Sequence, residues 1–406
     1  MLKIQAMRAT AVRGRRVQSL SELVATFRKL LRPKLCQSRY VWQIRSPVVS
    51  VRQLVMFVGL SALAVPTVAY SAEPLPEMQL DPTGTTVSGL SSGAYMAVQL
   101  HIANSRSIIG AGVVAGGPYF CAEGRLPTAL NRCMQTLIGQ PDADALLLRA
   151  RALADAGRID PLVGLADDRV YLFSGTRDRT VTRPVMDAAR DFYRGAGIAE
   201  QSIRYVNDIP AGHAFIVEEV ANACGVTGNP FINDCDYDQA GDILRHLYGA
   251  LERPAAMDGS RLLKFDQSEF LADPETHGMA SSGFVYIPAS CASGEPCRLH
   301  IAFAGCKQTP VDIGDLYART TGYNRWAETN RLVILYPQSS VSNGNPNGCW
   351  DWWGYDDPAY HTKRGRQMAA IATMAARLGV PFVAEPPSSF CQRLDDWNWS
   401  HWLGDR

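Results

Sequence analysis

Residues 85–103, TTVSGLSSGAYMAVQLHIA, hold the pattern that decides the fold. A short β-branched run leads into Gly89-Leu-Ser-Ser-Gly93, and a helix-like stretch follows. A G-x-S-x-G sequence between a strand and a helix is typical of a sharp turn, because its glycines allow a strained serine with an exposed hydroxyl group. We therefore predict a strand, a turn at Ser91 and a helix. A glycine-rich turn without a chemical role is the alternative.

The rest of the chain alternates between short apolar runs and helix-like stretches. Strand-like runs occupy residues 85–88, 108–114, 169–173, 202–206, 283–287, 299–303 and 332–335. Helix-like stretches occupy residues 94–103, 143–155, 183–194, 240–248, 315–330 and 366–378. Continuous apolar strands between helices indicate an α/β protein, with a mostly parallel sheet covered by helices on both faces. The polar stretch 252–275 is interpreted as a long connection within one domain.

A serine nucleophile needs a histidine base, and the base needs a carboxylate that orients it. In hydrolases with this motif the chain order is serine, acid, histidine. Asp178 ends the strand-like run RVYLFSGTRD, and His213 lies in the glycine-containing loop AGHAF after the next strand. Ser91, Asp178 and His213 are therefore the candidate catalytic residues. Asp187, in a helix-like stretch, and Asp208, before a proline, are weaker alternatives for the acid.

An oxyanion hole requires two backbone N–H groups near the nucleophile. One is expected from Ser92, and the other normally follows a strand that precedes the nucleophile in sequence. Too few residues lie between the leader and Ser91 to form that strand. A suitable strand occurs downstream at residues 298–303, followed by Ala304-Gly-Cys-Lys-Gln308. These positions predict a circularly permuted hydrolase, which is permissible because domain termini often lie close together.

Five segments together closely resemble one enzyme family. They are GLSSG (89–93), GTRD (175–178), AGHAF (211–215), GCKQ (305–308) and NPNGCWDWWGY (345–355). The resemblance, over about residues 78–380, is to the short-chain polyhydroxyalkanoate depolymerases with a permuted, type 2 catalytic domain. It implies an α/β-hydrolase fold with Ser91 as nucleophile, Asp178 as orienting acid and His213 as base. It also implies that the amides of Ser92 and Cys306 form the oxyanion hole.

The resemblance implies a serine esterase that acts on poly(3-hydroxybutyrate) or its oligomers, as a monomer without cofactor or metal. One departure is Ala304, which stands where the family commonly has histidine before Gly-Cys. The backbone donor survives this change, but any contact from the histidine side chain is lost. A carboxylesterase for feruloyl, acetyl or other small esters is one alternative. A secreted binding protein without catalysis is another.

Four aromatic residues follow the asparagine-rich segment: Trp350, Trp352, Trp353 and Tyr355. Flat side chains beside an ester site can hold a methyl-bearing polyester without charge. We expect them to contribute to substrate binding, with one or two of the three tryptophans at the site and the rest in packing.

The charge is divided unevenly along the chain. Residues 1–72 hold 12 Lys/Arg and a single acid, Glu22, whereas residues 73–406 hold 28 Lys/Arg against 38 Asp/Glu. Residues 73–406 are too acidic to be a good candidate for a nucleic-acid-binding surface. The uncharged run Leu54–Ala72 after Arg45 and Arg52 is typical of a signal peptide, although it is just long enough to span a bilayer. We predict a leader (1–72), cleavage near Ala72, one catalytic domain (73–406) and no membrane attachment after cleavage.

Cysteine usage supports export. Nine of the ten cysteines follow residue 72, with no C-x-x-C motif and no zinc-finger spacing. Disulfides in an oxidising compartment are the better interpretation. The near pairs are Cys121/Cys133, Cys224/Cys235 and Cys291/Cys297. Because Cys306 should supply an oxyanion donor and Cys349 precedes the tryptophans, we also predict a Cys306–Cys349 bridge, which would leave Cys391 free.

Overall fold

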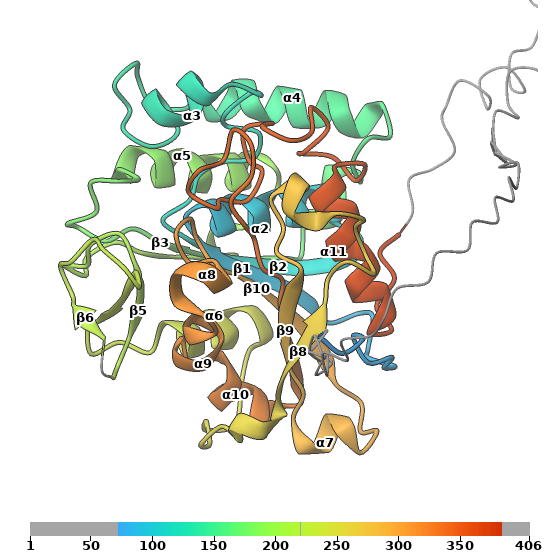
Figure 1. The fold of residues 1–406 in the computed structure, drawn as a ribbon. Helices are drawn as coiled ribbons and strands as arrows, with labels where there is room; N and C mark the ends of the chain where they lie inside the picture. Colours follow the sequence, from blue (N-terminus) through green and yellow to red (C-terminus); the bar gives the residue numbers. More distant parts are fainter. Residues whose placement is uncertain (1–71, 220, 384–406) are drawn as a thin grey trace, which may run out of the picture. The chain divides into compact units, whose positions relative to one another are not determined.

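The computed structural model describes residues 72–219 and 221–383, all within one compact unit, Ala69–Ser389. Its main feature is an eight-stranded sheet with the order β4-β3-β2-β1-β10-β11-β9-β8 (Figure 1). The strands are β1 (Thr85–Leu90), β2 (Ile108–Val114), β3 (Arg169–Phe173), β4 (Ile203–Val206), β8 (Leu262–Asp266), β9 (Ser282–Tyr286), β10 (Arg298–Phe303) and β11 (Leu332–Tyr336). The six from β4 to β11 are parallel, while β9 and β8 are antiparallel to their neighbours. The predicted mostly parallel sheet is confirmed.

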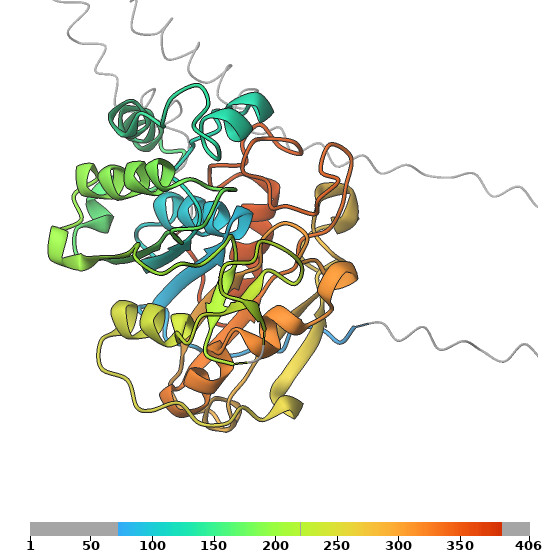
Figure 2. The same ribbon diagram turned by 90° about the vertical axis from the view of Figure 1, so that its left-hand side faces the viewer.

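Helices cover both faces of this sheet (Figures 1 and 2). They are α2 (Ser92–Ala103), α3 (Leu126–Asn131), α4 (Ala143–Asp155), α5 (Arg183–Gly195), α6 (Gln239–Tyr248), α7 (Ala289–Ala292), α8 (Pro310–Ile313), α9 (Leu316–Thr320), α10 (Tyr323–Asn330) and α11 (Arg366–Arg377). In β11, Val333 and Leu335 join the core under α2 and α11, while Ile334 and Tyr336 join the core with α6 and α10. This alternation explains why the strands read as continuously apolar, because each is buried on both sides.

The strand order supports the predicted permutation. The first four strands of the chain form one half of the sheet, and β8–β11 form the other half. Strand β10 pairs directly with β1, so that Gly89 lies opposite Phe303. The loop after β10 therefore emerges beside the Ser91 turn.

Two expectations about individual elements were wrong, and one small sheet was not predicted. The stretch 252–275 contains β8, which pairs with β9 and extends the sheet. The helix expected over residues 315–330 is two helices, because Gly322 lies between them with a φ of 93°. A second, three-stranded sheet of β5 (Phe215–Val217), β7 (Ile232–Asp234) and β6 (Asn222–Ala223) was not predicted, since its strands are only two or three residues long.

The leader and Cys391 lie outside the described residues. Within residues 72–219 and 221–383, no helix is both long and apolar enough to cross a membrane.

Candidate active site

Ser91 occupies the turn between β1 and α2. Its backbone has a φ of 56° and a ψ of −119°, a strained conformation for any residue other than glycine. Its N–H donates to the carbonyl of Val114, at the end of the neighbouring strand β2, over 2.9 Å. Ser91 is half-buried, whereas its neighbours Leu90 and Ser92 are fully buried. The turn therefore exposes the serine alone, as the motif predicts.

Both glycines of the motif are required by close backbone approaches. A Cβ at Gly89 would lie 2.3 Å from the carbonyl oxygen of Gly93. A Cβ at Gly93 would lie 2.4 Å from the carbonyl oxygens of Phe303 and Ala304. The second contact matters for the site, because it lets the start of α2 pack directly on the chain that leaves β10.

Asp178 and His213 form a buried pair. The Nδ1 atom of His213 lies 2.8 Å from Oδ2 of Asp178, and both side chains are nearly inaccessible to solvent. The other carboxylate oxygen of Asp178 accepts the N–H groups of Thr180 (2.7 Å) and Val181 (3.0 Å). The carboxylate is thus oriented from both sides, and it fixes the ring of the histidine.

The loops that carry this pair are fastened to each other. The amides of Thr176 and Arg177 donate to the carbonyls of Ile209 and Ala211. A Cβ at Gly175 would lie 2.3 Å from the carbonyl oxygen of Ala211, so only glycine permits this approach. These contacts bring the acid after β3 and the histidine after β4 together.

Residues 222–235 hold the backbone of the histidine loop through hydrogen bonds. The N–H of His213 donates to Oγ1 of Thr227 over 2.9 Å, and the N–H of Gly212 donates to the carbonyl of Cys224 over 2.9 Å. The Cys224–Cys235 disulfide closes this segment. The small sheet that sequence analysis missed is therefore part of the histidine's support.

The three candidate residues follow the carboxyl ends of β1, β3 and β4, which lie in one parallel half of the sheet. Carboxyl ends of parallel strands meet at one edge, where sites of α/β proteins form. In the described part of the chain Ser91 and His213 make no direct hydrogen bond. Such bonds are often long before substrate binds.

The loop after β10 packs against Ser91. A Cβ at Gly305 would lie 3.3 Å from Cβ of Ser91. The N–H of Gly305 donates to Oε1 of Gln308 (2.6 Å), and that of Lys307 donates to the carbonyl of Asn347 (2.8 Å). Among the described residues, the N–H of Cys306 between them has no hydrogen-bond partner. This N–H is free to donate to a ligand oxygen beside the serine.

The four bridges expected from the sequence are present. They are Cys121–Cys133, Cys224–Cys235, Cys291–Cys297 and Cys306–Cys349. The last joins the loop after β10 to the aromatic segment, with the two Sγ atoms 2.05 Å apart. Asn345 is buried beside it, donating to the carbonyl of Cys349 (2.8 Å) and accepting its N–H (2.9 Å). The two segments are thus held by a covalent bond and a hydrogen-bonded turn.

All three tryptophans of the aromatic segment are buried in the core. The indole of Trp350 donates to the carbonyl of Ala304 over 3.0 Å. Trp352 stacks on Tyr95 of α2 with ring centres 4.1 Å apart. Trp353 and the half-buried Tyr355 contact each other at 4.9 Å. These rings lie between α2, the helix that follows Ser91, and the loop after β10.

The chain is similar to known proteins along most of its length. No family model matches the chain. The chain is 46% identical over 314 residues to the poly(3-hydroxybutyrate) depolymerase of Delftia acidovorans, covering 76% of this chain. It is 36% identical over 334 residues to the polyhydroxybutyrate depolymerase of Talaromyces funiculosus, covering 77% of this chain and 94% of that protein. The chain belongs to the polyhydroxybutyrate depolymerase family.

Solved structures of polyhydroxybutyrate depolymerases support the same relationship. The crystal structure of the enzyme from Penicillium funiculosum matches with a TM-score of 0.69 at 35% identity, over 75% of this chain and 98% of that one. A serine-to-alanine PHB depolymerase complexed with an R3HB trimer matches equally well, at 34% identity. The chain spans only 62% of the length of the Delftia depolymerase. The family expected from the motifs, and its fold, are confirmed.

A serine–histidine contact that involves neither Ser91 nor His213 lies inside the sheet. His300 of β10 contacts Oγ of Ser88 at 2.8 Å through Nε2 and Oγ1 of Thr86 at 2.7 Å through Nδ1. All three are fully buried, and burial lowers the pKa of His300 to about 3, so the ring is neutral. Substrate cannot reach this pair, and no carboxylate contacts His300 in the described residues. We interpret it as packing between β1 and β10.

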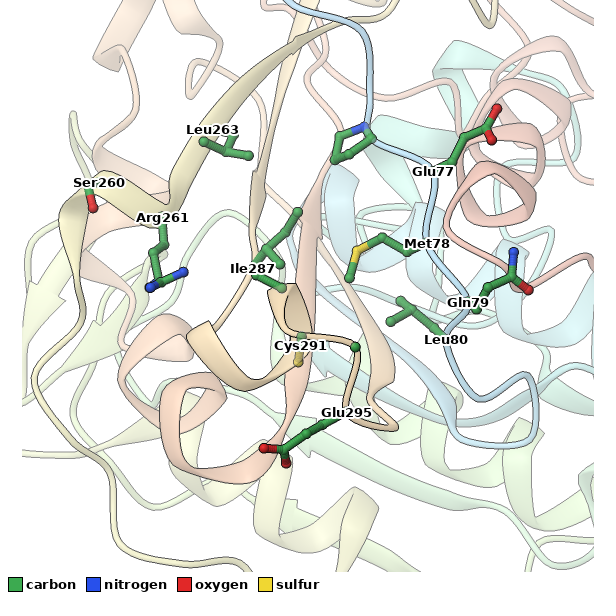
Figure 3. Close-up of a pocket in the computed structure, with 13 residues that line it drawn as sticks. Glu77, Met78, Gln79, Leu80, Ser260, Arg261, Leu263, Ile287, Cys291 and Glu295 are labelled. Carbon is green, nitrogen blue, oxygen red and sulfur yellow. The ribbon is translucent and has the colours of Figure 1, made fainter.

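One surface hollow is lined by none of the loops described above. Its volume is about 620 Å³, and it is bordered by residues 76–80, strand β8 and the segment around α7 (Figure 3). None of the candidate catalytic residues lines it. No group of His, Cys, Asp or Glu side chains suited to a metal ion occurs in the described part of the chain.

Sequence reasoning missed two buried polar residues near the site. The side chain of Gln308 accepts the N–H of Gly305, in the loop that contains Cys306. Asp351 accepts the N–H groups of Gly354 and Tyr355 on Oδ1 (2.7 and 3.0 Å), and two further amides on Oδ2. Burial raises its pKa to about 6, against the lowering effect of these hydrogen bonds. The signal for Asp351 was an acid between tryptophans, followed by glycine.

Proposed function

We propose that this protein hydrolyses ester bonds of poly(3-hydroxybutyrate) or its oligomers by serine catalysis. The observation that carries the proposal is the strained turn at Ser91, at the same sheet edge as the buried Asp178–His213 pair. Family membership supplies the substrate class, since a related depolymerase was crystallised with an R3HB trimer.

In the proposed reaction Oγ of Ser91 attacks the ester carbonyl carbon while its proton passes to Nε2 of His213. The carbonyl oxygen becomes an oxyanion that accepts the N–H groups of Ser92 and Cys306. Collapse of this intermediate expels the alcohol, which takes the proton back from the histidine. Water then cleaves the acyl-serine ester by the same steps. Asp178 holds the imidazole in the tautomer that can accept a proton at Nε2.

The disulfides and the acidic body support a secreted enzyme, because disulfides persist mainly in oxidising compartments. We propose that the leader directs export and that the mature protein acts outside the cytoplasm. The substrate carries no charge along its chain, so contact with it rests on shape and apolar surface.

The test compares two serines on the same strand-to-helix unit. Ser91→Ala should lose more than about a hundredfold of kcat/KM, about 2.7 kcal/mol, on an R3HB trimer and on polymer film. Ser88→Ala should be less stable, because it leaves His300 without one partner, yet should keep its turnover. Fluorophosphonate labelling should modify the wild-type protein and Ser88→Ala but not Ser91→Ala.

Three outcomes would separate the alternatives. A Ser91→Ala protein with more than a hundredth of wild-type kcat/KM would show that the nucleophile lies elsewhere. Hydrolysis of small aryl or acetyl esters without release of hydroxybutyrate units would indicate a carboxylesterase of other specificity. A wild-type protein that binds polymer but neither reacts with the label nor cleaves esters would be a binding protein.

A further inference from the structure

The side chain of Gln308 lies buried behind the loop of Cys306, with only 1% of the residue exposed. Its carbonyl oxygen Oε1 accepts the N–H of Gly305 over 2.6 Å. Its amide nitrogen Nε2 donates to the carbonyl of Pro230 over 2.7 Å and approaches that of Phe231 at 3.4 Å. Both ends of one amide are therefore used, each by a different loop.

The two loops have different parts in the proposed reaction. Gly305 precedes Cys306, whose amide is an oxyanion donor in the proposal above. Pro230 and Phe231 belong to the disulfide-closed segment that supports His213, and the carbonyl of Phe231 accepts the N–H of Phe215, two residues after the histidine, over 3.0 Å. In the described part of the chain, the bonds of Gln308 are the hydrogen bonds that join these loops directly.

The amide group suits this position for two reasons. It binds the N–H of Gly305, which leaves the adjacent N–H of Cys306 as the unpaired donor of the loop that packs against Ser91. It also holds the donor loop at a fixed distance from the base, and catalytic groups must be held to within about half an ångström. An alkyl chain of equal length would fill the space but join neither loop.

We propose that Gln308 is a positioning residue for ester hydrolysis, one that sets the oxyanion loop relative to the histidine loop. The inference rests on the proposed function. Gln308 touches no reacting atom, so its effect should fall on kcat and on transition-state affinity. Ground-state binding should change little, because the donor at Cys306 is engaged fully only when the oxyanion forms.

The first test uses Gln308→Met and Gln308→Glu. Gln308→Met keeps the volume and removes both bonds, so kcat should fall about ten- to a hundredfold at every pH, with KM changed less than threefold. In Gln308→Glu the neutral carboxyl group can still accept from Gly305 and donate to Pro230. The ionised group cannot donate. The ratio of its kcat to that of the wild type should therefore be highest at low pH and fall as pH rises.

The direction of that pH dependence separates positioning from an effect of the new charge on the histidine, and the uncharged Gln308→Met excludes repulsion of the oxyanion. A new negative charge near His213 would favour the protonated imidazole, and the kcat ratio would then rise with pH. A packing role would leave the ratio independent of pH. Either result overturns the proposal. Should Gln308→Met not fold, the pH dependence of Gln308→Glu still decides.

Gln267, which follows the edge strand β8, supplies a matched control. It is fully buried, accepts the N–H of Gln338 (3.0 Å) and donates to the carbonyl of Ala280 (2.6 Å). Gln267→Glu should lower the melting temperature without a pH-dependent change in the kcat ratio.

The second readout is the affinity of a trifluoromethyl ketone analogue of a short ester. Its Ki should rise in Gln308→Met by the same factor as kcat/KM falls. Wild-type turnover and its loss in Ser91→Ala are established first, so failure of the proposed function would show there. Normal wild-type turnover with kcat in Gln308→Met within twofold of wild type would overturn only the role of Gln308.

Discussion

At the scale of single residues, the site depends on groups that several close contacts hold in place. Ser91 is held at a positive φ by β1 before it and α2 after it, and strain of this kind costs about 1–3 kcal/mol. The packing of Gly93 against the carbonyls of Phe303 and Ala304 over-determines the turn. The surrounding strands and helix therefore maintain the strained backbone, and this backbone conformation exposes the hydroxyl group of Ser91.

Replacing Asp178 by asparagine tests the orienting role. The asparagine carbonyl should remain with the N–H groups of Thr180 and Val181, so its NH₂ group would face Nδ1 of His213. The ring would then have to accept at Nδ1 and carry its proton at Nε2, where it cannot act as base. We expect kcat to fall about a thousand- to ten-thousandfold, with little loss of stability.

Asp208→Asn is the matched control, because Asp208 is the exposed acid that the sequence left as an alternative. Its turnover should stay within about twofold of wild type. Equal losses in the two variants would remove Asp178 from its assigned role. Steady-state kinetics on the soluble trimer measures both.

At the scale of elements, the Cys306–Cys349 bridge joins the loop after β10 to the aromatic segment. It spans 43 residues, against 6 for Cys291–Cys297 beside α7. Because a disulfide restricts the unfolded chain more when its loop is longer, the chain-entropy model gives about 4 kcal/mol for the first and about 2 kcal/mol for the second.

The double variant Cys306→Ser/Cys349→Ser should therefore lose stability and also kcat, with a smaller change in KM, because the loop that it frees carries an oxyanion donor in the proposed reaction. The control Cys291→Ser/Cys297→Ser should lose stability alone. Denaturant unfolding and kinetics on the same preparations compare them. A fully active Cys306→Ser/Cys349→Ser protein would show that the loop is held without the bridge.

Residues 345–357 form a second segment that is held by internal bonds. The carboxylate of Asp351 accepts four backbone N–H groups. The backbone N–H of Asp351 donates to Oε1 of Gln367 in α11 over 2.9 Å. The hydroxyl of Tyr355 donates to the carbonyl of Cys349 over 2.9 Å. The tryptophans are thus carried by a turn with little freedom, whose hydrogen bonds lie inside the protein.

At the scale of the whole molecule, buried titratable groups set the stability at acid pH. Burial lowers the pKa of His300 to about 3 and that of His361 to about 4, both below the usual 6.5. The unfolded chain then binds protons that the folded chain does not. This stabilisation is complete above pH 6.5 and is lost as pH falls, by up to about 1.4 kcal/mol per pH unit for each histidine.

Asp351 acts in the opposite sense, because burial raises its pKa to about 6 and the folded chain takes up the proton first. Its contribution to stability grows as pH falls from about 6 towards 3.8. Replacing His300 by asparagine should make the free energy of unfolding less dependent on pH between 6.5 and 4, whereas Asp351→Asn should make it more dependent. Urea unfolding at several pH values measures both slopes, and slopes that change in the same direction would contradict these assignments.

The start of the mature chain is also a property of the whole molecule. Glu73 already belongs to the fold, because its carbonyl accepts the N–H of Asp266 at the end of β8 over 2.8 Å. Cleavage near Ala72 would leave this contact intact. We expect N-terminal sequencing of protein from the medium or periplasm to begin at Ala72 or Glu73. Recovery of the intact Met1 form from the cytoplasm, with reduced cysteines, would contradict both export and oxidation.

The sequence by itself determined the features that depend on short stretches of neighbouring residues. The Ser91 turn, the order of serine, acid and histidine, and the alternation of strands and helices depend on neighbouring residues. For that reason they could be read before any packing was known. The permutation was predicted from the strand at residues 298–303, and in the structure this strand, β10, pairs with β1.

Only the tertiary structure decided which distant groups meet. Strand β8 has little pattern of its own and is a strand because β9 offers it hydrogen bonds. The tryptophans are buried because α2 and the loop after β10 close over them, which their sequence does not specify. Gln308 gains its place from two loops that are some eighty residues apart in the chain. Hydrogen bonds between such segments have no local signature, since the free energy that makes them comes from the fold that first brings them together.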